Sequence, residues 1–134
     1  MSKENLEVVR DHYDATNERD FARAMAHFDV DVELVVPPGY IDPGQYKGRD
    51  AVGAWFADWF SSFDRDARFD VTEMTELDGG AVLLVADHHA RGRISGVEVH
   101  GTVVWLYGLQ RGKIARVEGY ASRAEALKAV GRAD

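Results

Sequence analysis

The chain has 134 residues, no cysteine, and 23 Asp and Glu against 16 Lys and Arg, which gives a formal charge of −7 at pH 7. This length suits a single domain over residues 1–134. The acidic balance and the scattered basic residues argue against nucleic acid as a partner, and the lack of cysteine excludes disulfides and thiolate chemistry. No stretch approaches the ~20 apolar residues of a membrane span, so we expect no membrane contact and a cytoplasmic protein.

Two helices are predicted at the start of the chain. Apolar side chains recur at helical spacing from Leu6 onward, which predicts a helix that ends near Asn17. Asp20 can cap a second, shorter helix whose apolar stripe begins at Phe21. A strand should then start near Asp31.

The next segment, residues 37–45, contains three prolines and two glycines and is predicted to be a loop. A third helix should begin near Asp50 and carries a broad aromatic stripe. Strands are then predicted at about 67–77, 81–93, 97–110 and 113–121, joined by turns that contain glycine. A short helix near 123–130 should close the fold.

Four segments of the chain carry a family resemblance: Arg10–Asp20, Tyr46–Val52, Gln110–Ile114 and Tyr120–Leu127. Together they resemble the SnoaL-like branch of the nuclear-transport-factor-2 superfamily, whose best-known relatives are the ketosteroid isomerases. The resemblance implies an α+β fold, a cone-shaped barrel in which N-terminal helices pack on a curved, mostly antiparallel sheet. That fold hosts isomerases, cyclases, epoxide hydrolases, dehydratases and binding modules, so the resemblance specifies no reaction.

The hairpin register predicts which side chains share a face of the sheet, because directly opposite residues do so. We take Ser95-Gly96 and Arg111-Gly112 as the central residues of two hairpin turns. This register places Asp87 and His89 on the face that the helices should cover and turns His88 to the other face. A single β-bulge would exchange the two histidines. The same covered face carries four further expected ligand contacts: Val104, Leu106, Val117 and Gly119.

Both faces of the central strands are apolar, and three helices can cover only one of them. The other face bears Trp105, Tyr107 and Tyr120 in this register. We expect a second copy of the chain to cover it, which predicts a homodimer.

Asp87 and His89 alternate on one strand, about 7 Å apart at the backbone, and a carboxylate beside an imidazole in an apolar pocket is a candidate acid and base pair. The resemblance places His12 at the position of the ketosteroid isomerases' oxyanion-hole tyrosine, which implies that it points into the cavity. Strand histidines and aspartates are more often structural. We expect neither a metal nor another cofactor. The expected walls of the cavity are Tyr13, Tyr40, Trp55, Phe56 and Trp59.

The chain lacks catalytic residues that characterise the enzymes it resembles. Ketosteroid isomerases carry aspartates where this chain has Val36 and Val104, and SnoaL-type polyketide cyclases carry one where it has Gly119. Those mechanisms are therefore not expected here.

Two functions remain open. The first is a small dimeric enzyme that binds an apolar cyclic or aromatic carbonyl compound and moves a proton next to the carbonyl, in an isomerisation, an aldol cyclisation or a dehydration. The second is a non-catalytic binding module or accessory subunit that holds a hydrophobic small molecule.

Overall fold

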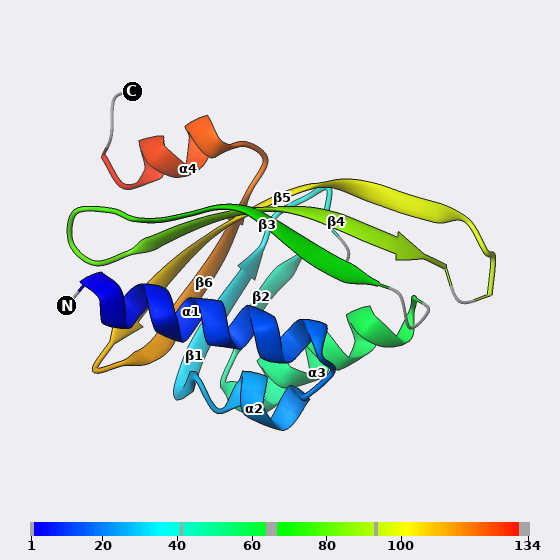
Figure 1. Ribbon diagram of the computed structural model, residues 1–134, viewed down its shortest axis with the longest axis horizontal. Helices are drawn as coiled ribbons and strands as arrows, with labels where there is room; N and C mark the ends of the chain where they lie inside the picture. Colours follow the sequence, from blue (N-terminus) through cyan, green and yellow to red (C-terminus); the bar gives the residue numbers. More distant parts are fainter. Residues whose placement is uncertain (1, 41, 64–66, 93, 132–134) are drawn as a thin grey trace.

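The predicted helices and strands all form, within a few residues of their expected ends. Figure 1 shows the computed structural model, which describes residues 2–40, 42–63, 67–92 and 94–131. The element order is α1 (Ser2–Asn17), α2 (Phe21–Met25), β1 (Phe28–Val36), β2 (Gly44–Lys47), α3 (Arg49–Ser61), β3 (Arg68–Glu76), β4 (Val82–Arg91), β5 (Glu98–Gln110), β6 (Lys113–Tyr120) and α4 (Arg123–Ala129). Asp20 caps α2 by accepting a hydrogen bond from the backbone N–H of Arg23 at 3.2 Å. The short strand β2 was not predicted.

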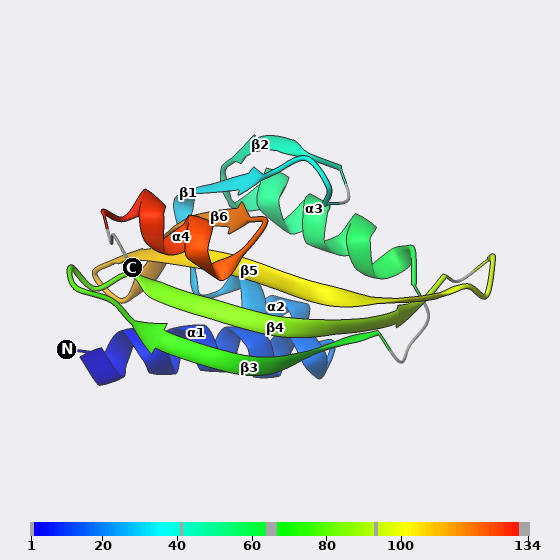
Figure 2. The same cartoon turned by 90° about the horizontal axis from the view of Figure 1, so that it is seen from above.

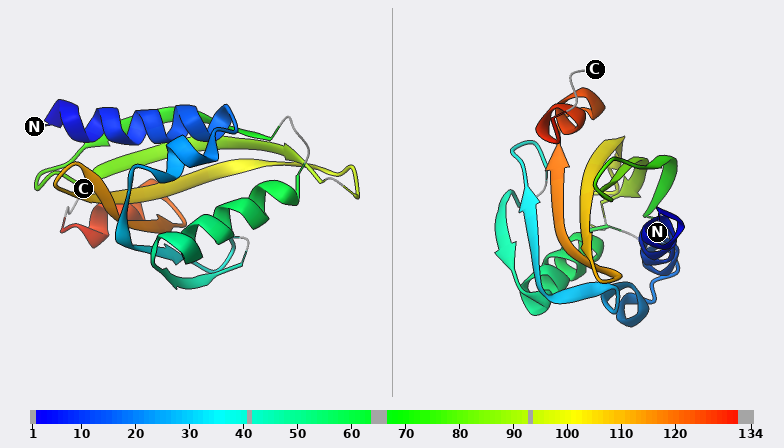
Figure 3. Two further views of the ribbon diagram at one scale, coloured as in Figure 1. Left: turned by 90° about the horizontal axis from the view of Figure 1, so that it is seen from below. Right: turned by 90° about the vertical axis from the view of Figure 1, so that its left-hand side faces the viewer.

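The strands form one sheet in the order β2-β1-β6-β5-β4-β3, which Figure 2 shows from above. β1 and β6 are parallel, and the other neighbours are antiparallel. The sheet is curved, with α1, α2 and α3 on one side and α4 on the other (Figures 1 and 3). We call the side of α1–α3 the inner face and the side of α4 the outer face. This is the α+β architecture that the sequence predicts.

One inserted residue changes the register between β5 and β6. Next to the turn, Gln110 pairs with Lys113, as predicted. Beyond it Ala115 has no direct partner on β5, and Gly108 pairs with Arg116. This β-bulge displaces every later pair by one residue, and a displacement of one residue exchanges the faces of all the side chains that follow.

The bulge separates side chains that the predicted register puts together. Val117 pairs with Tyr107, and Gly119 pairs with Trp105, all on the inner face. The outer face instead carries Asp87, His89, Val104 and Leu106. β4 and β5 also pair two residues away from the prediction, with Asp87 opposite Thr102, but this shift keeps the same faces together. The prediction that Val117 and Gly119 share a face of the sheet with Asp87, His89, Val104 and Leu106 is therefore wrong.

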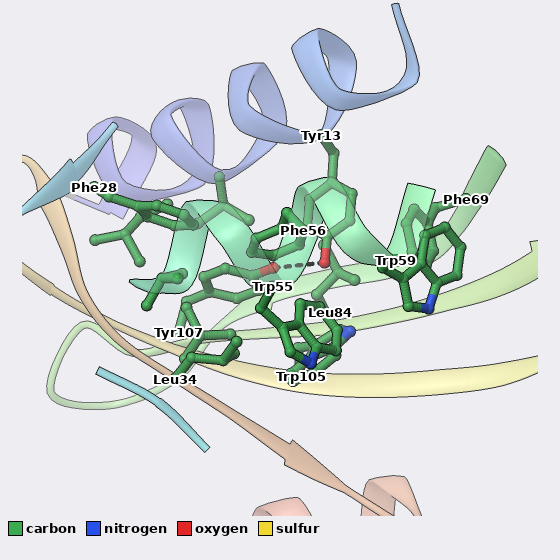
Figure 4. Packing of buried hydrophobic residues seen from close by; sticks show 14 of the residues in the cluster. Tyr13, Phe28, Leu34, Trp55, Phe56, Trp59, Phe69, Leu84, Trp105 and Tyr107 are labelled. Carbon is green, nitrogen blue, oxygen red and sulfur yellow. Dashed lines mark hydrogen bonds between the residues drawn. The ribbon is translucent and has the colours of Figure 1, made fainter. Parts of the chain in front are cut away.

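The main hydrophobic core fills the inner face. Figure 4 shows side chains of the sheet packed against those of α1 and α3. The aromatic stripe predicted for α3 is buried in it, at Trp55, Phe56, Trp59 and Phe60. A second, smaller cluster lies under α4 on the outer face, where Ala126 and Leu127 contact the sheet.

The face predicted for a homodimer does not exist in the fold. Trp105 and Tyr107 are 5% and 0% exposed because α1 and α3 cover them, whereas Tyr120 lies on the outer face beside α4. The prediction that these three residues together form a dimer contact is therefore wrong. None of the helices formed by the described residues is both long and apolar enough to cross a membrane.

Candidate functional site

A cavity of about 220 Å³ lies between α1, α3 and the inner face of the sheet. It is lined by Tyr13, Gly39, Tyr40, Trp55, Phe56, Trp59, Phe69, His88, His100, Gly101, Thr102, Val103 and Trp105. None of these described residues is an Asp, Glu, Lys or Arg, so the walls favour an uncharged ligand. The volume is below the ~300–1,000 Å³ of sites for drug-sized molecules, which suits a compound of one or two rings.

All five aromatic residues expected as walls, from Tyr13 to Trp59, lie in this lining. The four ligand contacts expected on the strands, Val104, Leu106, Val117 and Gly119, do not. Val104 and Leu106 pack under α4, and Val117 is buried in the core away from the cavity. At Gly119 an added Cβ would lie 2.8 Å from Cδ of Pro37 and 2.9 Å from Cζ3 of Trp105, so the indole ring fills that space.

Tyr13 offers a hydrogen-bond donor to the cavity. Its hydroxyl lies 2.5 Å from that of Tyr107 (Figure 4). Either hydroxyl can be the donor in this bond. When the fully buried Tyr107 donates to Tyr13, the proton of Tyr13 is available to a ligand. Burial raises the pKa of both hydroxyls, so they stay protonated, and Tyr13 acts as a donor and not as a base.

Two histidines line the cavity, and His88 is the buried one, whereas His100 is exposed. His88 is 7% exposed, and the centroid of its ring lies 4.7 Å from that of Trp59 and 5.6 Å from those of Phe63 and Phe69. Its Nε2 is buried and has no hydrogen-bond partner among the described residues. Burial lowers the pKa of His88 to about 4, so the ring is neutral at pH 7. A neutral imidazole can accept a hydrogen bond or a proton.

The predicted pair Asp87 and His89 does not reach the cavity. Asp87 accepts a hydrogen bond from the hydroxyl of Thr102 at 3.2 Å, and Nε2 of His89 lies 3.3 Å from a carboxylate oxygen of Asp70, all on the outer face. The expectation that they project inward is wrong because the helices cover the face of Trp105 and Tyr107, and Asp87 and His89 lie on the opposite face of β4. Within the part of the chain that the structure describes, no three His, Asp or Glu side chains are arranged to hold a metal ion.

His12 is also placed differently from the expectation. It is fully buried, its Nδ1 donates to the carbonyl of Ala24 at 3.1 Å, and four aromatic rings surround it. Burial lowers the pKa of His12 to about 4, so it is neutral at pH 7. His12 therefore joins α1 to α2, and the next residue, Tyr13, lines the cavity in its place.

Tyr40 supplies a wall but no free polar group. Its hydroxyl accepts a hydrogen bond from the backbone N–H of Val104 at 3.0 Å and donates to the carbonyl of Tyr120 at 2.7 Å. Its ring packs edge-on against Trp105, with centroids 5.2 Å apart. The hydroxyl therefore anchors the chain beside the cavity, and Tyr13 and His88 carry the reactive polar groups of the inner wall.

Solved structures with the same fold are numerous. An NTF2-like protein of Burkholderia pseudomallei is 21% identical over 96% of this chain and 98% of its own, with a TM-score of 0.76. A Xanthomonas campestris protein provisionally assigned as a polyketide cyclase is 19% identical over 96% and 98%, with a TM-score of 0.77. TerC, co-crystallised with polyporic acid, is 20% identical over 93% and 96%, with a TM-score of 0.76. These similarities define an NTF2-like fold.

The sequence itself defines the family within that fold. The model of the SnoaL-like domain matches residues 9–117, and the chain belongs to the SnoaL-like domain family. None of the curated proteins compared with it matches significantly in sequence. Solved structures that share the fold include provisionally assigned polyketide cyclases and a protein of unknown function.

Proposed function

We propose that the protein binds an uncharged cyclic or aromatic carbonyl compound of one or two rings and catalyses proton transfer next to its carbonyl group. The observation that carries this proposal is the presence of Tyr13 and His88, a hydroxyl donor and a neutral base, in the wall of one apolar cavity. Isomerisation, aldol cyclisation and dehydration all include such a step.

The two residues have complementary roles. Tyr13 donates its free proton to the carbonyl oxygen of the ligand and stabilises the negative charge that forms there as an enolate. His88 accepts the proton that leaves the neighbouring carbon, and its positive charge is then balanced by the enolate. Because its pKa is lowered to about 4, His88 is a weak base. The substrate must therefore carry an acidified C–H, such as one between two carbonyl groups or between a carbonyl and an aromatic ring.

Two of the structural neighbours are consistent with a small-molecule ligand. TerC was co-crystallised with polyporic acid, and the Xanthomonas campestris protein is provisionally assigned as a polyketide cyclase.

A binding module without catalysis is the second candidate, and one observation favours it. No carboxylate lines the described cavity, so nothing there stabilises a positive charge on His88 before the ligand becomes negative. In that case Tyr13 and His88 would only orient the ligand through hydrogen bonds.

The test uses 1-tetralone and 2-tetralone as ligands. All three tryptophans of the chain line the cavity, so binding should quench the intrinsic fluorescence. Exchange of the C1 protons of 2-tetralone in D₂O then reports proton transfer. We expect His88→Gln and Tyr13→Phe each to slow the catalysed exchange by about 100-fold or more. His89→Gln, on the outer face, is the control and should leave the rate unchanged.

The outcomes separate the candidates. Binding with catalysed exchange supports the enzyme, and binding without exchange supports the binding module. A chain that binds neither ketone contradicts both. Because Tyr13→Phe leaves the buried hydroxyl of Tyr107 without a partner, the double variant Tyr13→Phe/Tyr107→Phe serves to separate lost chemistry from lost stability.

A further inference from the structure

The cavity wall contains a row of three residues in which one side chain is missing. Phe69 on β3, His88 on β4 and Gly101 on β5 are direct cross-strand neighbours, and all three line the cavity. Opposite residues of an antiparallel pair hold their Cβ atoms about 4.5–5.5 Å apart. Any side chain at position 101 would therefore stand directly beside the imidazole, as the ring of Phe69 does on its other side.

Nothing in the backbone requires glycine at position 101. Gly101 does not adopt a positive φ, and the β4–β5 ladder runs without a register shift from Val82 to Arg91, so there is no bulge. A Cβ added at Gly101 would meet no described atom within 4 Å. Gly119 differs, because there the rings of Pro37 and Trp105 occupy the position of a side chain.

A glycine in the interior of a strand has a cost. It is less stable there than alanine, and it often marks a place where a ligand approaches the backbone closely. At Gly101 the open space lies beside the one imidazole whose Nε2 is buried in the cavity wall without a partner among the described residues. The missing side chain thus lies directly opposite the residue that carries the unpaired nitrogen.

We propose that Gly101 is the specificity-determining residue of the cavity, because its missing side chain leaves the space beside His88 in which the reacting ring of the ligand sits. The ligand ring completes the row that Phe69 and His88 begin. Larger residues at this position restrict the cavity to smaller ligands. This inference rests on the proposed function for the choice of ligand, but not for the existence of the space.

The first test compares Gly101→Ala and Gly101→Val with the wild-type chain. Both variants should fold with an unchanged or higher Tm, because each replaces a strand glycine in open space. Because its two methyl groups would occupy the space of the ligand ring, Gly101→Val should weaken the binding of 1-tetralone by about tenfold or more, with Gly101→Ala in between. Gly108→Ala is the matched control, since its Cβ would lie 3.7 Å from Cβ of Arg116, away from the cavity. It should bind 1-tetralone as the wild type does.

The second test does not depend on the ketone. Xenon enters apolar cavities, so a crystal of the wild-type protein under xenon pressure should show an atom beside Gly101 and His88, and a crystal of Gly101→Val should not. If the wild type binds no ketone but shows this difference in xenon, the proposed ligand class fails and the role of Gly101 stands. If Gly101→Val binds 1-tetralone as tightly as the wild type, the role of Gly101 fails and the proposed function stands. A lower Tm in Gly101→Ala would show that the fold requires glycine at this position, and it would overturn the inference.

Discussion

The two faces of β4 and β5 carry opposite chemistry although they are built from alternating residues of the same strands. On the inner face, His88 lies in a cavity wall of aromatic and uncharged side chains. Its neighbours Asp87 and His89 lie on the outer face, where they contact Thr102 and Asp70. Three consecutive residues thus divide between an apolar cavity wall and a partly exposed polar face, so the chemistry of each depends on its face more than on its type.

The difference also has an energetic side. A polar atom that is buried without a partner costs about 1–3 kcal/mol, and Nε2 of His88 is such an atom. Ion pairs on the outer face, such as that of Arg123 with Glu73 at 2.8 Å, contribute little because water screens them. The inner face therefore provides most of the stability of the sheet, and it gives up a part of this stability at His88.

The largest expected effect tests this contrast in stability. Phe28 is fully buried in the inner core, so Phe28→Ala should lower the free energy of unfolding by about 3–5 kcal/mol. Arg123→Ala removes an outer ion pair and should cost at most about 1 kcal/mol. Urea denaturation measures both. Equal losses in the two variants would contradict the division between the faces.

A second prediction concerns pH and the buried His12. Its pKa is about 4 in the folded chain, against 6.5 for a free histidine, so the unfolded state binds more protons between these values. Its contribution to stability is complete above pH 6.5 and should fall by about 3 kcal/mol on acidification to pH 4. We expect a flatter profile in His12→Asn, whose amide can still donate to Ala24. His89→Asn, on the outer face, should keep the slope of the wild type, and a wild-type profile without any slope would refute the role of His12.

A third prediction tests the packing at Gly119, where side chains fill the space in which a ligand was expected. In Gly119→Ala the new Cβ would press on Pro37 and Trp105 at 2.8 and 2.9 Å. Such overpacking should lower the free energy of unfolding by about 1–3 kcal/mol. Gly108→Ala is the control and should not destabilise, because its Cβ meets only ordinary contacts. An unchanged stability in Gly119→Ala would mean that the indole ring moves freely.

The smallest effect is expected at Asp87 and His89, the pair that the sequence analysis predicted to be catalytic. Asp87→Asn and His89→Gln change half-exposed side chains outside the cavity, so each should alter the free energy of unfolding by no more than about 0.5 kcal/mol. Neither should change ketone binding by fluorescence. A large loss of binding in Asp87→Asn would show that the outer face takes part in the site.

The sequence by itself determined the local structure of this protein. The apolar spacing after Leu6 and the aromatic stripe of α3 located the helices, and Asp20 located the start of α2. The turn at Arg111-Gly112 located the hairpin, and the pair nearest to it formed as predicted. These features depend on neighbours within one or two turns of the chain. The five aromatic walls of the cavity were found for the same reason, since they lie on helices or on a short loop whose orientation the local pattern determines.

Only the tertiary structure decided which strand residues face the cavity. Gly108, a glycine within a strand, was the available sign of irregular pairing, but it did not say where the extra residue lies. The insertion at Ala115 lets Trp105 pack over Gly119 and Tyr107 over Val117, and the helices then cover these large side chains. Strand side chains alternate with a period of two, so one inserted residue reverses the face of every residue beyond it. The packing of α1 and α3 against the whole sheet selects between the two registers, and no local segment contains that information.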